Sequence, residues 1–203
     1  MQRLRFTGAI AGVGSASGVR FVVGRWVRSP LGAFADVMVE DASGHRTLLA
    51  PSEEVADFVQ QTYRFDEVCT TPVSVGVTND GWDVHVEGHL SAYLRLGGRQ
   101  PLGWLLRVVP PPLAASPAWA TAIDPLARLV LRGVRTRGTA LEGRREWYGA
   151  TDLHSVTSLA GSWRGTPLGT LADVDPPCRF GFSSTPTRPG VTSVVTTVEV
   201  LGD

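Results

Sequence analysis

The chain has 203 residues, of which 43% are hydrophobic and 19% are charged, and its 19 basic and 19 acidic residues cancel, as is typical of one soluble globular domain. Every basic residue is arginine, which excludes a Schiff-base lysine, a pyridoxal phosphate anchor, a P-loop lysine and the paired lysines of acetoacetate-decarboxylase-type sites. No apolar run approaches the roughly 20 residues of a membrane-spanning helix, and a neutral chain without a nucleic-acid motif is not expected to bind DNA or RNA.

The first fifty residues predict two hairpins, because short apolar runs with strand-like alternation are separated by Gly-rich turns. Their strands are expected at 4–13 with 19–27, and at 35–40 with 45–50. The two arginines and small residues at the start also resemble a secretory signal. Gly8, Gly12 and Gly14 interrupt its apolar part, so we interpret the segment as a strand.

One short helix is predicted at about 53–63. Ser52 suits the N-cap, and Glu53 and Glu54 suit the positive end of a helix. The residues that recur at helical spacing are Val55, Phe58, Val59 and Thr62. The predicted helix is therefore amphipathic.

The remainder of the chain is expected to contain more strands and a second helical region. Asn79-Asp80-Gly81 is a strong hairpin turn. Helix-start signals at Ser116-Pro117 and Asp124-Pro125 predict two short helices or one kinked helix over about 117–132. The expected strands are 67–78, 82–96, 102–109, 134–139, 144–148, 155–163, 179–184 and 192–201.

These elements predict an α+β fold of a single domain, residues 1–203. It is mostly antiparallel β, barrel-like or a strongly curled sheet, with two or three short helices. Such a sheet offers an interior cavity, which the helices at 53–63 and 117–132 would cover.

A twelve-residue phrase occurs twice, at 26–37 (WVRSPLGAFADV) and 163–174 (WRGTPLGTLADV), with identity at seven positions. Ser/Thr-Pro-Leu-Gly alone is a good turn, so coincidence explains part of the match. The flanking Trp and Ala-Asp-Val extend it beyond the turn. The alternative interpretation is an internal repeat, 19–37 with 156–174, related by a pseudo-twofold axis.

His85, Glu87 and His89 are the candidate metal ligands. They occupy alternate positions of the predicted strand 82–96 and would share one face. Alternate strand residues stand about 6.6 Å apart, so three in a row reach one ion only if the strand bends. The simpler interpretation is a solvated polar face of an antiparallel strand.

A second cluster supplies candidate catalytic residues, which are Glu146, Tyr148, Asp152 and His154. Glu146 or His154 would act as general acid or base, and Tyr148 would polarise a carbonyl. The candidate ligand-binding residues are Arg145, suited to a carboxylate, and the two repeated tryptophans, Trp26 and Trp163. An exposed edge with mixed charged and aromatic residues explains the same pattern without a site.

No G-x-S-x-G, H-E-x-x-H, C-x-x-C or EF-hand motif is present, and the identity of any cofactor is unknown from the sequence. Cys69 and Cys178 are expected to be free thiols of a cytoplasmic protein, or a disulfide if the chain is exported. The leading hypothesis is binding of a small, partly apolar molecule without chemistry. The alternatives are a metal-assisted or acid-base enzyme and a homodimeric interaction module.

Overall fold

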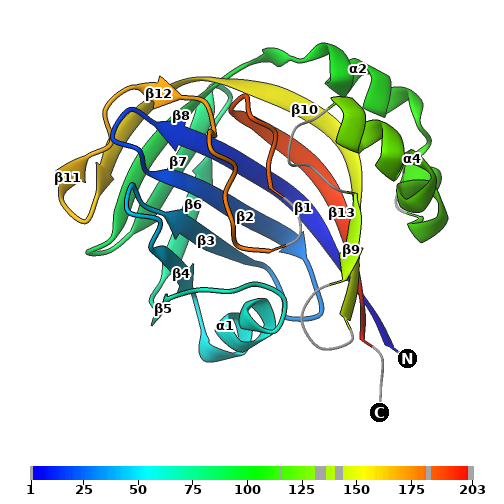
Figure 1. The fold of residues 1–203 in the computed structure, drawn as a ribbon, viewed down its shortest axis with the longest axis horizontal. Coiled ribbons are helices and arrows are strands. Elements are labelled where there is room, and N and C mark those ends of the chain that lie inside the picture. The colour runs from blue at the N-terminus through cyan, green and yellow to red at the C-terminus, as the bar shows by residue number, and fades with distance from the viewer. Residues whose placement is uncertain (1, 115, 131–135, 140–143, 182–183, 201–203) are drawn as a thin grey trace.

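One curled sheet forms most of the molecule in the computed structural model, which describes residues 2–114, 116–130, 136–139, 144–181 and 184–200 (Figure 1). Its strands are β1 (Gln2–Ser15), β2 (Arg20–Arg28), β3 (Phe34–Glu40), β4 (Arg46–Ala50), β5 (Glu67–Thr70), β6 (Val73–Val77), β7 (Gly81–Val86), β8 (Leu90–Arg99), β9 (Arg137–Thr139), β10 (Arg144–Trp163), β11 (Thr166–Pro167), β12 (Leu171–Ala172) and β13 (Gly190–Val200). The helices are α1 (Glu53–Gln60), α2 (Pro101–Val108), α3 (Pro111–Ala114) and α4 (Pro117–Val130). The predicted fold class, a mostly antiparallel α+β fold with a strongly curled sheet, is confirmed.

The curl follows from the strand order, which is β5-β4-β3-β2-β1-β13-β10-β8-β7-β6. Neighbours on this path are antiparallel except β4 and β5, which are parallel. The two ends of the path, β5 and β6, are consecutive in the chain and are joined through Thr71 and Pro72. Three Cα-to-Cα steps reach at most about 11 Å. The two outer strands are therefore close together, and the sheet forms a half-barrel.

The main hydrophobic core fills the inside of this curl. Apolar side chains from β1 to β4 meet those from β6, β7, β8 and β10. Its fully buried members include Val13, Phe21, Val23, Val84 and Leu94. Burial of these side chains supplies the main free energy that stabilises the fold.

A second apolar layer covers the opposite face of β1 to β4. Helix α1 packs Val55, Ala56 and Val59 there, against Leu48 and Ala50 of β4. The loop segment 174–180 packs beside the helix, as its Val174, Cys178 and Phe180 contact Val22 of β2. The central parts of β2 and β4 are thus covered on both faces, which explains their continuous apolar runs at 21–23 and 48–50.

Helix α1 begins where the sequence places it and ends slightly earlier, at Gln60. The Ser52 hydroxyl accepts a hydrogen bond from the Val55 amide at 3.3 Å, as an N-cap residue does. The next residues, Thr62 and Tyr63, donate their amides to the Val59 carbonyl in a tight turn. This turn directs the chain back toward the sheet.

The strand predicted at 102–109 is wrong, because residues 102–108 belong to helix α2. Pro101 occupies the start of the helix, where its missing amide costs nothing. The apolar side chains that suggested a strand lie on the surface, with Trp104, Leu105 and Val108 exposed. Short apolar runs do not distinguish a strand from a helix by pattern alone.

The single strand predicted at 82–96 is two strands, β7 and β8, joined by a turn at residues 87–89. Gly88 has a φ of 71°, in the left-handed region that glycine adopts without strain. Strand 67–78 is likewise divided into β5 and β6. The Asn79-Asp80-Gly81 turn is confirmed as the β6–β7 connection.

No strand forms in the described part of the segment predicted at 179–184; residues 182 and 183 lie outside the described residues. Buried Glu40 holds this segment instead. Its carboxylate accepts the Arg179 amide at 2.7 Å and pairs with the Arg179 guanidinium at 3.1 Å. The expected strands 144–148 and 155–163 are one continuous strand, β10, and 134–139 is described only in part, as β9.

The two copies of the repeated phrase adopt different local structures. In the first copy, Pro30 lies in the turn between β2 and β3. In the second, the turn is at Arg164-Gly165, both with positive φ, and Pro167 belongs to strand β11. The internal repeat stays a prediction. No helix among the described residues is long and apolar enough to cross a membrane.

Candidate functional site

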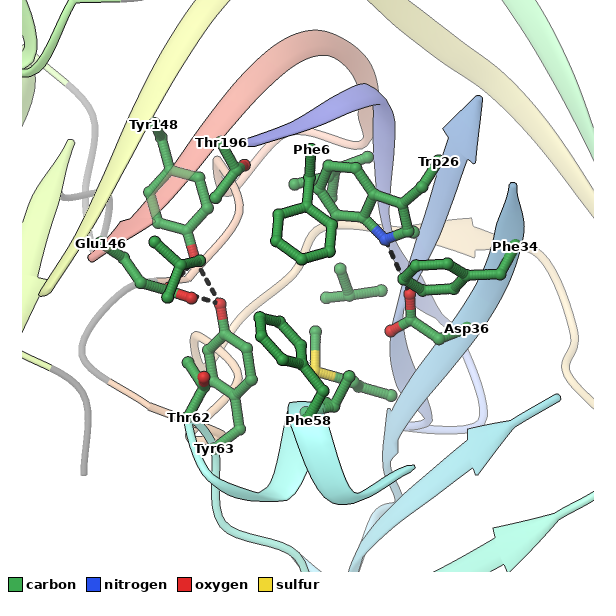
Figure 2. A pocket seen from close by; sticks show the side chains of 16 residues that line it. Phe6, Trp26, Phe34, Asp36, Phe58, Thr62, Tyr63, Glu146, Tyr148 and Thr196 are labelled. Atoms are coloured by element: carbon green, nitrogen blue, oxygen red, sulfur yellow. Dashed lines mark hydrogen bonds between the residues drawn. The ribbon is translucent and has the colours of Figure 1, made fainter. Parts of the chain in front are cut away.

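A cavity lies between the sheet and helix α1, on the face opposite the barrel core (Figure 2). It offers about 60 Å³ to the centres of water molecules, several times the roughly 10–15 Å³ that one water needs. The described residues that line it are Phe6, Ile10, Val22, Gly24, Trp26, Phe34, Asp36, Met38, Phe58, Val59, Thr62, Tyr63, Glu146, Tyr148, Thr196 and Val198.

Four aromatic rings form one wall of the cavity. Phe6 lies against Trp26, Phe34 and Phe58, with ring centroids 5.8, 6.4 and 4.9 Å apart. Trp26 and Phe34 are direct neighbours across β2 and β3, and the alternation of the strands turns both rings to the cavity face. Phe58 reaches the same group from α1. The wall is apolar and is built by elements distant in the sequence.

Asp36 is a buried carboxyl group in this wall, 4% exposed. It accepts a hydrogen bond from the Trp26 indole N–H at 3.0 Å. Its partner across the sheet is Gly24, where a Cβ atom would lie 2.4 Å from Asp36 Oδ1 and 2.8 Å from Trp26 Nε1. Glycine at this position leaves the space in which the indole meets the carboxylate.

Burial raises the pKa of Asp36 from an ordinary value of 3.8 to about 7, because the apolar surroundings penalise the charged form. The Trp26 hydrogen bond stabilises the carboxylate and opposes this shift only in part. At neutral pH the group is close to half ionised. A carboxyl group with this pKa is able to exchange a proton with a bound molecule.

A second polar group faces Asp36 from the opposite side of the cavity (Figure 2). The hydroxyls of Tyr63 and Tyr148 lie 3.1 and 2.9 Å from Glu146 Oε2 and also contact each other. Burial, followed by the nearby Glu146 charge, raises the pKa of both phenols well above their usual value of 10. Both tyrosines therefore keep their protons over the whole physiological range.

Two threonine hydroxyls complete the polar part of the lining. Thr62 follows α1 and Thr196 lies on β13, and the two residues are 3% and 4% exposed. Neither hydroxyl has a hydrogen-bond partner among the described residues. A buried hydroxyl without a partner costs free energy, and both residues belong to the cavity lining.

A bulge in β10 divides the predicted catalytic cluster. Glu146 and Tyr148 pair with Val198 and Thr196 of β13 and line the cavity, but the pairing shifts between Ala150 and Asp152. One extra residue in a strand turns the following side chains to the other face. Asp152 and His154 therefore lie outside the cavity, although all four residues belong to one strand.

Asp152 and His154 form a separate polar group near α2. The Asp152 carboxylate pairs with Arg99 at 2.7 Å and with Arg107 at 3.7 Å. His154 Nε2 lies 3.6 Å from Asp152 Oδ2. Hydrogen bonds from Arg99 and the Leu153 amide lower the pKa of Asp152 despite its partial burial. This arrangement joins α2 to β10.

The candidate metal ligands lie at the tip of the β7–β8 hairpin. His85 and Glu87 are exposed, and His89 Nδ1 is 2.9 Å from the Glu87 carbonyl oxygen. Within the described ranges, no group of three His, Cys, Asp or Glu side chains is arranged to hold a metal ion.

No protein-family model matches the chain, and no curated protein matches it. Among solved structures, the chain is similar to an acetoacetate decarboxylase from Legionella pneumophila. That similarity has 9% sequence identity and a TM-score of 0.46, and it covers 100% of this chain and 86% of the other.

The three candidate ligand-binding residues are placed apart. Trp26 lines the cavity. Trp163 is buried in the barrel core, with the Arg164 guanidinium 4.9 Å from its ring centroid. Arg145 is exposed beside Glu146, on the other face of β10. Among the three, only Trp26 lines the cavity.

Sequence reasoning missed Asp36, Tyr63 and Thr196 as site residues. Asp36 had a signal, since it belongs to the repeated phrase, and the helical spacing had placed Phe58, Val59 and Thr62 in an amphipathic helix. Tyr63 and Thr196 had none, because the turn after α1 and the pairing of β13 with β1 and β10 decide their positions.

Both cysteines are free in the structure. Cys69 packs against the barrel core and Cys178 lies in the layer on the opposite face. Burial raises the pKa of the Cys178 thiol to about 12, so this thiol is unreactive at neutral pH.

Proposed function

We propose that the protein binds a small, partly apolar molecule in the cavity between helix α1 and the sheet. The observation that carries this proposal is the cavity lining, which combines aromatic and aliphatic side chains with the buried polar residues Asp36, Thr62 and Thr196. A few polar groups in an aromatic and aliphatic lining are typical of a small-molecule site. The lining would select a molecule with an apolar body and at least one polar group.

Native mass spectrometry of the untagged protein, combined with thermal shifts against a small-molecule library, tests the proposal. We expect a retained or stabilising molecule whose affinity falls about 5- to 30-fold in Thr62→Val or Thr196→Val, since each loses one hydrogen bond worth about 1–2 kcal/mol.

Thr197→Val is the matched control. Thr197 is also buried with a hydroxyl that lacks a partner in the described part of the chain, but it points to the other face of β13. An equal loss of affinity in Thr197→Val and the two cavity variants would contradict binding in this cavity, as would a library without a single stabilising compound.

An acid-base enzyme is the second candidate, and the pKa of Asp36 near 7 favours it. In this function the Asp36 carboxylate would take a proton from a carbon next to a ketone. The C–H electron pair would then form the C–C double bond of an enolate, and Asp36 would return the proton to the same carbon. The reaction is balanced without any cofactor.

Deuterium exchange of cyclohexanone in D2O, followed by NMR, measures this activity. The enzyme hypothesis predicts catalysed exchange that falls at least 100-fold in Asp36→Asn, with the rate of the wild type rising as pH increases toward 8 because the carboxylate is the base. Exchange at the uncatalysed rate in the wild type would rule out this proton abstraction and leave a binding protein.

A further inference from the structure

We propose that the molecule bound in this cavity is a cationic amine with an apolar body, and that Asp36 is its counter-ion. This inference rests on the binding function proposed above and adds the charge class of the ligand. The hydroxyls of Thr62 and Thr196 both donate and accept hydrogen bonds, so they do not decide the charge. The remaining polar groups do.

The charges on the cavity wall favour a cation. Asp36 is a buried carboxyl group of the lining, and none of the described lining residues is Arg or His although the chain contains 19 Arg. The other carboxyl group of the lining, Glu146, accepts hydrogen bonds from Tyr63 and Tyr148. Of the ion pairs that join described residues, none includes Asp36. An anionic ligand beside Asp36 would meet like charge in an apolar medium, whereas an ammonium group would supply the missing opposite charge.

The aromatic rings around Asp36 favour the same class. Phe34 is two residues from Asp36 on β3, and Trp26 donates its indole N–H to the carboxyl group. Their ring centroids are 6.4 Å apart, and Phe6 lies within 5.8 Å of Trp26. Aromatic faces attract cations, most strongly where water is excluded. A carboxylate is an acceptor only, which matches the N–H donors of an ammonium group.

Binding of an amine would be coupled to the proton of Asp36. Among the described lining residues, the other titratable groups are Tyr63, after α1, and Glu146 and Tyr148 on β10. The two phenols keep their protons because their pKa values are well above 10. A cation beside Asp36 lowers its pKa and releases the proton. With a free-state pKa of about 7, the ionised fraction increases about tenfold between pH 6 and pH 8, and the affinity should increase about tenfold with it.

Isothermal titration calorimetry of the full chain with two matched probe series tests the inference. One series is isobutylamine, isobutanol and isobutyrate, and the other is benzylamine, benzyl alcohol and benzoate. We expect the amine of at least one series to bind at least tenfold more tightly at pH 8 than the alcohol of the same series, with no binding of either carboxylate. The affinity of that amine should fall about tenfold at pH 6.

Asp36→Asn should reduce the affinity for the amine at least tenfold and abolish its pH dependence. The matched control is Asp173→Asn, because Asp173 occupies the same place in the second copy of the repeated phrase but is exposed. The affinity of this variant for the amine should equal that of the wild type. The pH dependence of the wild type tests the inference even if Asp36→Asn does not fold.

An alcohol or carboxylate that binds as tightly as its amine, or amine binding that Asp36→Asn leaves intact, would overturn the counter-ion role. Either result would leave the binding function standing. If none of the six probes binds, the amine inference fails, while the library screen with the threonine variants decides the binding function separately.

Discussion

Asp36 makes the stability of the protein depend on pH in an unusual direction. Its pKa is about 7 in the folded chain and near 3.8 when the carboxyl is solvated, so the folded state binds the proton more tightly. Between these two values, the unfolded state has released the proton while the folded state still holds it, so the free energy of unfolding falls as the pH rises. The stability contributed by the neutral carboxyl is therefore present at low pH and is lost as the pH rises toward 7.

Asp36→Asn measures this effect. The free energy of unfolding of the wild type should fall by about 2–3 kcal/mol relative to Asp36→Asn between pH 5 and pH 8, because asparagine has no proton to lose. Urea denaturation at several pH values gives the difference. Asp66 and Glu67, whose pKa values are lowered by Arg46 and Arg164, are ionised throughout this range. A difference that does not change with pH would contradict a raised pKa.

At the residue scale, the sequence identified several side chains of the site but not the residues that they contact. Trp26 stood out because of the repeated phrase, and Glu146 and Tyr148 stood out as acid and phenol two residues apart. Tyr63 contacts Glu146 and Tyr148, from which it is separated by 83 and 85 positions in the sequence. No local pattern contains that information.

At the element scale, a buried ion-pair cluster fixes the segment 174–180 beside α1. Glu40 is fully buried and pairs with Arg20, its neighbour across β2 and β3, at 3.1 Å. Arg20 donates to the Pro176 carbonyl at 2.6 Å, and Arg179 donates both its amide and its guanidinium to Glu40. The cluster thus connects two strands to a segment more than 130 residues away.

Glu40→Ala should lower the free energy of unfolding by about 3–5 kcal/mol, since it leaves the buried Arg20 guanidinium without its counter-charge. Chemical denaturation gives the value. Glu87→Ala, at the exposed turn between β7 and β8, is the control and should change stability by less than about 0.5 kcal/mol. A loss below 1 kcal/mol in Glu40→Ala would show that the cluster does not hold the segment.

Turns and caps were the elements that the sequence predicted best, because local backbone chemistry determines them. Ser52 and Asn79-Asp80-Gly81 are examples. Helix α2 and the bulge in β10 were not predicted. Packing against β10 decides the helix, and pairing with β13 decides the bulge. Neither interaction leaves a periodic pattern of residues in the sequence.

At the scale of the whole molecule, the curled antiparallel sheet was predicted but the position of the cavity was not. The expectation was a cavity inside the barrel, covered by the helices at 53–63 and 117–132. The barrel interior is instead filled by apolar side chains, and the cavity lies on the outer face under α1 alone, without a described lining residue from α4. Alternation along a strand separates two faces but does not reveal which face keeps an open space.

Strand β2 connects the barrel core to the cavity, because one face of the strand packs in the core and the other face lines the cavity. Val22 and Val23 are adjacent in the chain, yet Val22 lines the cavity and Val23 is fully buried in the barrel core. A change of volume at Val23 shifts the backbone that carries Gly24 and Trp26. If the cavity binds a ligand as proposed, substitutions at Val23 should change its preference while every residue that lines the cavity stays the same.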